Sequence, residues 1–199
     1  MVLQVPLGAA IVKNDLLAWL VAVHMGTALV ITDLLVMISG LLSQPATRPV
    51  YSWVASALWQ AFGLSAATAI LGSYIAHSGV GKVCRNLTAC FTAAAWHQGL
   101  ALLLMHIAVA LTLGMGMGMG SVFVWRNQLP LLPRTRFFLA FALSLYGVQV
   151  VLGIFMLLTG TPTIMIAFHE PTGASIEVLL LAATIAEHEV GAQCEIPSS

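Results

Sequence analysis

Four histidines lie in or beside strongly apolar stretches of this sequence: His24, His97, His106 and His169. Ionisable side chains inside a membrane-spanning segment are energetically costly, so they are candidate functional groups by default. Imidazole nitrogen is also a common ligand for iron and other transition metals. For each histidine the alternative is a structural role, with the ring hydrogen-bonded to a neighbouring carbonyl.

Two of these histidines, His97 and His169, are predicted to lie at the same depth. They fall about four and five residues into helical spans predicted at 93–113 and 164–185, which run in the same direction. At about 1.5 Å rise per residue, both would lie roughly 6–8 Å below the outer edge of the membrane. Two histidines from parallel helices at one depth can hold a heme iron from both faces. The level pair therefore predicts a bound heme b.

The other two histidines are weaker candidates. His24 is predicted one to two turns deeper than the pair and is a possible further heme ligand. His106 follows His97 by nine residues, which turns it by about 180° around the same helix, so these two cannot serve one metal. Glu177 follows His169 by eight residues, and it is a weak candidate for a catalytic proton carrier. A protonated interhelical contact is the alternative for Glu177.

The elements that position these residues are predicted to be membrane helices. Of 199 residues, 60% are hydrophobic and 7% are charged, and the mean hydropathy is +0.99, whereas charged residues make up about 25% of a soluble domain. The composition predicts an all-α integral membrane bundle in a lipid bilayer. A net charge of zero with seven scattered basic residues argues against a nucleic-acid partner.

About five spans of some 20 residues fit into this single transmembrane domain. The first, at 15–42, precedes a four-helix unit at 51–185, and a short acidic tail follows at 186–199. The apolar N-terminus lacks the basic start of a signal peptide and is predicted to be retained. The Gly-Met run at 114–120 is predicted as a frayed helix end, with Cu(I) binding by its methionines as the alternative. Within the four-helix unit the spans are predicted at about 51–76, 93–113, 137–158 and 164–185.

The basic residues predict the orientation in a cell membrane. Four arginines fall on the side of the first and third loops, against three basic residues on the other side, which places the C-terminus in the cytoplasm by the positive-inside rule. The loop that contains Cys84 and Cys90 would then be extracytoplasmic, where a disulfide can persist. A Cys84–Cys90 disulfide is predicted; two free thiols are the alternative, and a zinc or redox site fits the spacing less well.

Several short motifs, taken in order, resemble the heme A synthase family. Leu71-Gly72-Ser73-Tyr74 is followed by His77-Ser78-Gly79-Val80-Gly81, then by Cys84, Cys90 and His97. Later come 146–153 (YGVQVVLG), 158–162 (LTGTP) and His169. The likeness covers about 51–185, one four-helix half of that family's usual eight helices. It implies a heme between His97 and His169, and a paired Cys84 and Cys90.

The resemblance also implies an activity: the oxidation of the C8 methyl of heme O to the formyl of heme A, for terminal oxidases. The family has an acidic residue where this chain has Ala94, and an arginine where it has Gln98. Two functions follow as hypotheses, a compact heme-dependent oxidoreductase of this type or a non-catalytic b-type cytochrome subunit of a respiratory oxidase. A heme-free scaffold or small transporter is a third. A single half further predicts a homo-oligomer or association with oxidase subunits.

Overall fold

Helices form the regular structure of this protein. The computed structural model describes residues 3–41, 52–80, 92, 99–129 and 131–191, and contains no strand within those ranges. Five of its helices are long and apolar enough to cross a membrane, which confirms the predicted all-α bundle of about five spans. In chain order the helices are α1 (Gln4–Lys13), α2 (Ala18–Leu41), α3 (Ser52–His77), α5 (Leu100–Arg126), α6 (Pro133–Thr159) and α7 (Thr163–Gly191).

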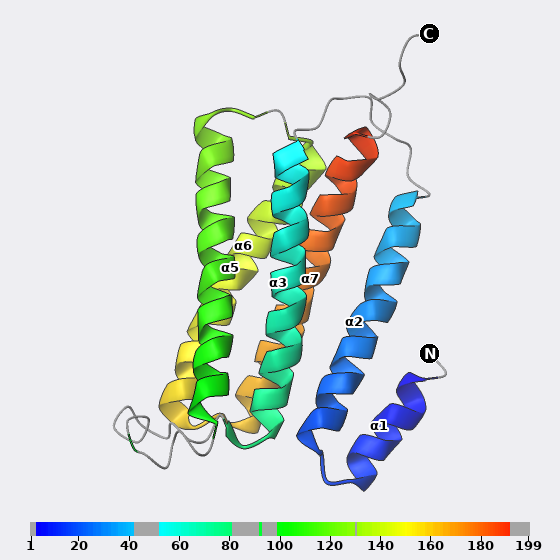
Figure 1. Ribbon diagram of the computed structural model, residues 1–199, viewed down its shortest axis with the longest axis vertical. Helices are drawn as coiled ribbons and strands as arrows, with labels where there is room; N and C mark the ends of the chain where they lie inside the picture. Colours follow the sequence, from blue (N-terminus) through cyan, green and yellow to red (C-terminus); the bar gives the residue numbers. More distant parts are fainter. Residues whose placement is uncertain (1–2, 42–51, 81–91, 93–98, 130, 192–199) are drawn as a thin grey trace.

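The spanning helices alternate in direction. Figure 1 shows that α2, α5 and α7 run one way while α3 and α6 run back. Helix α7 is the central element, since it packs against α6, α3 and α2, whereas α5 packs against α3 and, less closely, α6. The short α1 lies beside the first half of α2. Its ten residues rise only about 15 Å, too little to span a bilayer.

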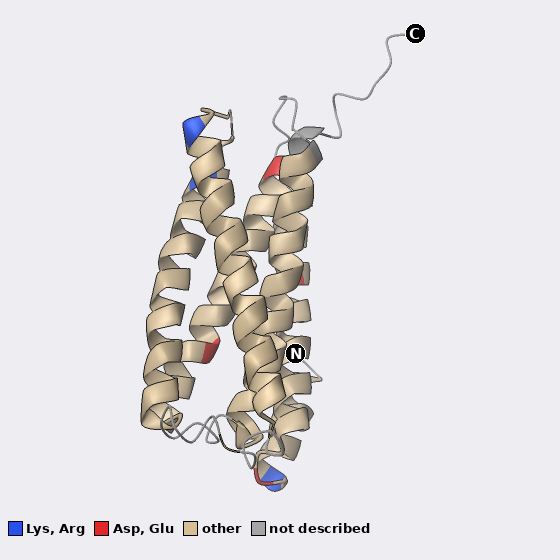
Figure 2. Ribbon diagram, turned by 60° about the vertical axis from the view of Figure 1, so that its left-hand side comes forward, with Lys and Arg blue, Asp and Glu red and all other residues tan. Residues whose placement is uncertain are grey.

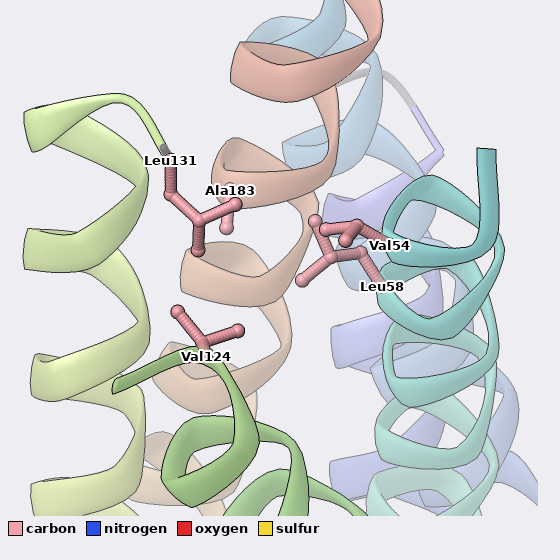
Figure 3. Close-up of a cluster of buried hydrophobic side chains, with 5 residues drawn as sticks. All are labelled: Val54, Leu58, Val124, Leu131 and Ala183. Carbon is pink, nitrogen blue, oxygen red and sulfur yellow. The ribbon is translucent and has the colours of Figure 1, made fainter. Parts of the chain in front are cut away.

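Buried apolar side chains of the described residues form three clusters along the bundle. One cluster joins α5 and α7 to the start of α3 and to the segment before α6; its members are Val54, Leu58, Val124, Leu131 and Ala183 (Figure 3). A second cluster lies nearer the middle and includes Leu113, Ala142 and Leu180. A third cluster lies where α3 ends and α5 begins, and includes Ile75 and Leu103.

Three helix bounds differ from the sequence prediction. Helix α5 begins at Leu100 rather than near residue 93, and residues 93–98 lie outside the described part of the chain. The Gly-Met run at 114–120 is helical within α5 rather than a frayed end. Lipid offers no partner for an open backbone N–H or C=O, so the helix continues despite the low helix propensity of glycine. Helix α7 extends to Gly191, so the predicted tail at 186–199 starts inside it.

A buried carboxylate ties the end of α7 to the start of α6. Glu187 is 3% exposed, and its Oε1 accepts a hydrogen bond of 3.0 Å from the backbone N–H of Leu132. This N–H directly precedes α6, where backbone donors have no intrahelical acceptor. A negative charge also interacts favourably with the helix dipole at this end.

Replacing Glu187 with alanine is expected to destabilise the protein by about 1–3 kcal/mol, because a buried donor loses its acceptor. Glu187→Gln keeps an oxygen at the same place and is expected to lose clearly less. Thermal unfolding in detergent, followed by circular dichroism, measures both variants. Equal losses in the two variants would show that the charge, rather than the hydrogen bond, is what stabilises this helix end.

Candidate ligand-binding cavity

One cavity of about 300 Å³ lies between α3, α5, α6 and α7. Most of its wall is aliphatic, and ligand pockets of this mostly apolar kind use a few polar groups to orient what they bind. The largest polar side chains in the wall are those of His106, Tyr146, Gln149, His169 and Glu170. The structure thus gathers two of the four apolar-segment histidines around one space.

His106 and His169 are level with each other. Each lies six residues after the first residue of its helix, α5 or α7, and these helices run in the same direction. Six residues correspond to about 9 Å along the axis in both cases. The two rings are also close enough to interact electrostatically. The level pair in the structure is therefore His106 with His169.

Small residues of α3 leave room for the His106 ring. A Cβ added at Gly72 would lie 2.8 Å from His106 Cε1, closer than two such atoms can approach. The imidazole also interacts with the backbone carbonyl of Thr68, one turn earlier in α3. Its Nδ1 is buried and has no hydrogen-bond partner. The Nδ1 atom is thus left without a protein partner.

His169 has a comparable environment on the other side of the cavity. Its Nδ1 is likewise buried without a partner, and a Cβ at Gly153 would be 3.5 Å from its Cε1. The next residue, Glu170, reaches His77 Nδ1 at 3.7 Å. This contact, an ion pair when His77 is protonated, joins α7 to the end of α3, and the Glu170 carboxyl group lies in the cavity wall.

Tyr146 fixes the wall between α5 and α6. Its hydroxyl donates to the carbonyl of Ala110 at 2.7 Å. Its ring packs directly on Gly114, so that a Cβ added at Gly114 would lie 2.3 Å from the Cζ atom of Tyr146. Sequence analysis assigned no role to Tyr146, Gly72 or Gly114. The sequence signal that could have identified the two glycines is their position inside predicted helices, where a glycine often marks the close approach of a neighbouring side chain.

Two further predicted site residues, His24 and Glu177, do not line this cavity. His24 lies near α1, with its Cε1 3.8 Å from where a Cβ of Gly8 would be. Glu177 interacts with Asp33 of α2 instead. His97, Cys84 and Cys90 lie outside the described residues, so the His97 ligand and the disulfide stay predictions, as do the roles of Ala94 and Gln98.

The described part of the chain holds no group of three or more His, Cys, Asp or Glu side chains that could bind a bare metal ion. A heme is different, because its porphyrin supplies four ligands and the protein needs to supply two at most. Two histidines are thus enough protein ligands for a heme.

The fold and the cavity define a class of protein: a multi-pass helical membrane protein with an intramembrane cavity that two histidines line. Comparisons with protein-family models, with curated proteins and with solved structures found no match. The resemblance to heme A synthases accordingly stays a prediction from short motifs.

Proposed function

We propose that this protein binds a heme in the cavity, with His106 and His169 as the axial ligands. The observation that supports this most is the level pair of histidines, each with a buried and unpartnered ring nitrogen. Parallel helices of a bundle present such a pair to opposite faces of one iron. His169 was the expected ligand from the sequence. His106 takes the place that the sequence prediction gave to His97.

The surroundings fit this cofactor. The apolar wall suits a porphyrin, and the Thr68 carbonyl lies near the His106 ring, where it could accept the second hydrogen bond that ligating histidines make. On α5 and α6, the wall residues Leu111 and Ile154 are 55% and 53% exposed. The cavity therefore meets the lipid between these helices, and a largely apolar ligand can approach from there.

The activity we propose is the one that the resemblance implies: oxidation of the C8 methyl of heme O to the formyl of heme A, in which water supplies the oxygen atom and an external electron acceptor takes the four electrons. A bound heme would supply the redox chemistry. Glu170 supports the proposal, because it places a carboxyl group in the cavity wall, where Glu177, the sequence candidate, does not lie. The heme, the reaction and the residues are tested separately below.

The first test is the dithionite-reduced minus oxidised spectrum of the purified protein. We expect the α band of a b-type heme. If the band is absent from protein expressed with ample heme, the heme proposal is wrong.

The reaction is tested next, by coexpression with a source of heme O and chromatography of the extracted hemes. Heme A or its alcohol intermediate is the expected product.

The second candidate function is a non-catalytic b-type cytochrome subunit of a respiratory oxidase. The observation that favours it is the pair of histidines itself, because ligands on both faces of an iron leave no free position for oxygen. Such a heme suits electron transfer. A b-type band without heme A or its alcohol in the extraction experiment would select this function.

Gly72 offers a test of the second ligand without removing it. Gly72→Ala is expected to displace the His106 ring, since the added Cβ would lie 2.8 Å from it; heme content should fall several-fold while the protein still folds. Gly63→Ala is the matched control, as nothing lies within 4 Å of a Cβ there on the same helix. Heme content per protein measures both. Normal content in Gly72→Ala would argue against His106.

We also propose the orientation in the membrane. Arg126 is the last residue of α5, Arg134 and Arg136 lie in the first turn of α6, and Lys13 lies in the last turn of α1. Figure 2 shows that the basic residues lie at the two ends of the bundle. The positive-inside rule places the arginine end in the cytoplasm, so the histidines lie nearer the outer face. Single-cysteine labelling at Ser121 and Asn14 would test this orientation. Homo-oligomers or contacts with oxidase subunits also remain part of the proposal.

A further inference from the structure

Two carboxyl groups meet between α2 and α7, apart from the cavity. Asp33 of α2 and Glu177 of α7 interact through their side chains. Glu177 is 0% exposed, and neither of its carboxyl oxygens has a partner in hydrogen-bond geometry. Asp33 is half-buried, and its Oδ1 is likewise unpartnered. Both helices belong to the spanning set, so the pair lies within the membrane.

No positive charge compensates this acidic pair. Across the described ranges, Lys and Arg lie only near the two ends of the bundle, whereas acidic residues also lie at intermediate heights (Figure 2). Two ionised carboxylates at short range repel each other, and the repulsion grows as the dielectric constant falls. A doubly charged pair would therefore be strongly unfavourable here.

The other helices packed on α7 do not supply a counter-charge either. In α3 the titratable residues are Tyr74 and His77, and His77 is engaged with Glu170 at the far end. In α6 the Arg136 side chain donates to the Leu129 carbonyl, Arg134 reaches the Ala186 carbonyl, and the Tyr146 hydroxyl donates to Ala110. Asp33 is the one titratable group found facing Glu177 among the described residues.

We propose that Asp33 and Glu177 form an intramembrane proton-binding site, in which the two carboxyl groups hold one proton between them. The proton supplies the donor that the facing oxygens lack and removes one of the two charges. Buried carboxyl pairs that share a proton are a known way to keep like groups together. Carboxyl groups inside membrane helices serve in proton relays, and this is the chemistry that we assign to the pair.

This site is independent of the heme proposal. Glu177 lies eight residues after His169, about 12 Å further along the helix axis, and neither carboxyl lines the cavity. Loss of the carboxyl pair should therefore leave the heme content unchanged. The proton site stands or falls by its own measurements.

Thermal unfolding in detergent as a function of pH is the first measurement. A proton held by the folded protein and released by the unfolded chain makes stability fall as pH rises through the range where the pair loses that proton. We expect this fall in the wild type. Asp33→Asn should shift it to lower pH, because the neighbouring negative charge is gone, and Asp33→Asn with Glu177→Gln should abolish it. Asp15→Asn, at an exposed position between α1 and α2, is the matched control and should change nothing.

The second measurement uses the wild type alone, so it does not depend on a variant that folds. Dicyclohexylcarbodiimide modifies protonated carboxyl groups in apolar surroundings, and mass spectrometry locates the adduct. We expect an adduct on Asp33 or Glu177 that declines as pH rises. Absence of the adduct at every pH, or a fall in stability that persists in the double variant, would overturn the proposal. So would protection by sodium ions but not by choline at fixed pH, which would identify a metal cation as the ligand.

Discussion

Replacing His169 with alanine is expected to abolish the b-type absorbance of the purified protein. The change removes one of two axial ligands and leaves the other histidine to hold the iron from one face. His169 is half-buried in the cavity wall, and its Nδ1 makes no hydrogen bond that the substitution would break. We therefore expect the variant to fold and to lose most of its heme, measured as the pyridine hemochrome per protein.

The matched control is His24→Ala. His24 is also half-buried with an unpartnered Nδ1, but it faces α1 rather than the cavity, so its loss should leave the heme in place. His106→Ala should behave like His169→Ala, and His97→Ala should retain the band. Loss of the band in His97→Ala with retention in His106→Ala would restore the ligand pair predicted from the sequence.

The sequence alone was sufficient for the architecture. Runs of some 20 apolar residues can cross a bilayer only as helices, because each backbone group must find its partner within the segment. In the sequence, Pro45 lies between the first two predicted spans and Pro162 between the last two, and proline cannot continue a helix. The direction of each span followed from simple alternation. These predictions rest on strong local rules and do not depend on how the helices pack.

The predicted pairing of the histidines depended on where each helix begins, and the sequence indicates the first residue of a helix only poorly. A start at residue 93 made His97 level with His169, whereas the described helix begins at Leu100 and makes His106 level with it. The seven-residue difference corresponds to about 10 Å. No capping residue or proline marks this start, as Gly99 precedes the helix with φ of 99° and without a side-chain cap.

The contacts between helices could not be predicted from the sequence, for a different reason. Glu177 was recognised as a polar residue within a span, but nothing in one sequence says that it meets Asp33, or which faces of α2 and α7 pack together. In lipid the packing of helices is decided by close fit between small and large residues rather than by apolar periodicity. The ten-residue α1 was not predicted either, because its apolar composition does not distinguish it from a longer span.

Gly114→Ala is expected to be the most destabilising single-methyl change in α5. The new Cβ would lie 2.3 Å from the Tyr146 ring, and the ring can move away only by breaking the 2.7 Å hydrogen bond from its hydroxyl to the Ala110 carbonyl. Overpacking costs about 1–3 kcal/mol and a lost hydrogen bond about 1 kcal/mol, against at most about 1 kcal/mol gained in helix propensity. A net loss of roughly 1–3 kcal/mol follows.

The same helix provides the controls for this prediction. Nothing lies within 4 Å of a Cβ at Gly116 or Gly118, so alanine at either position should be neutral or stabilising by up to about 1 kcal/mol. Tyr146→Leu combined with Gly114→Ala should recover part of the loss, because the smaller side chain vacates the space. Thermal unfolding in detergent measures all four proteins. If Gly114→Ala is as stable as Gly116→Ala, then α5 and α6 do not meet through Tyr146, and the wall that closes the cavity between these helices must be built from other residues.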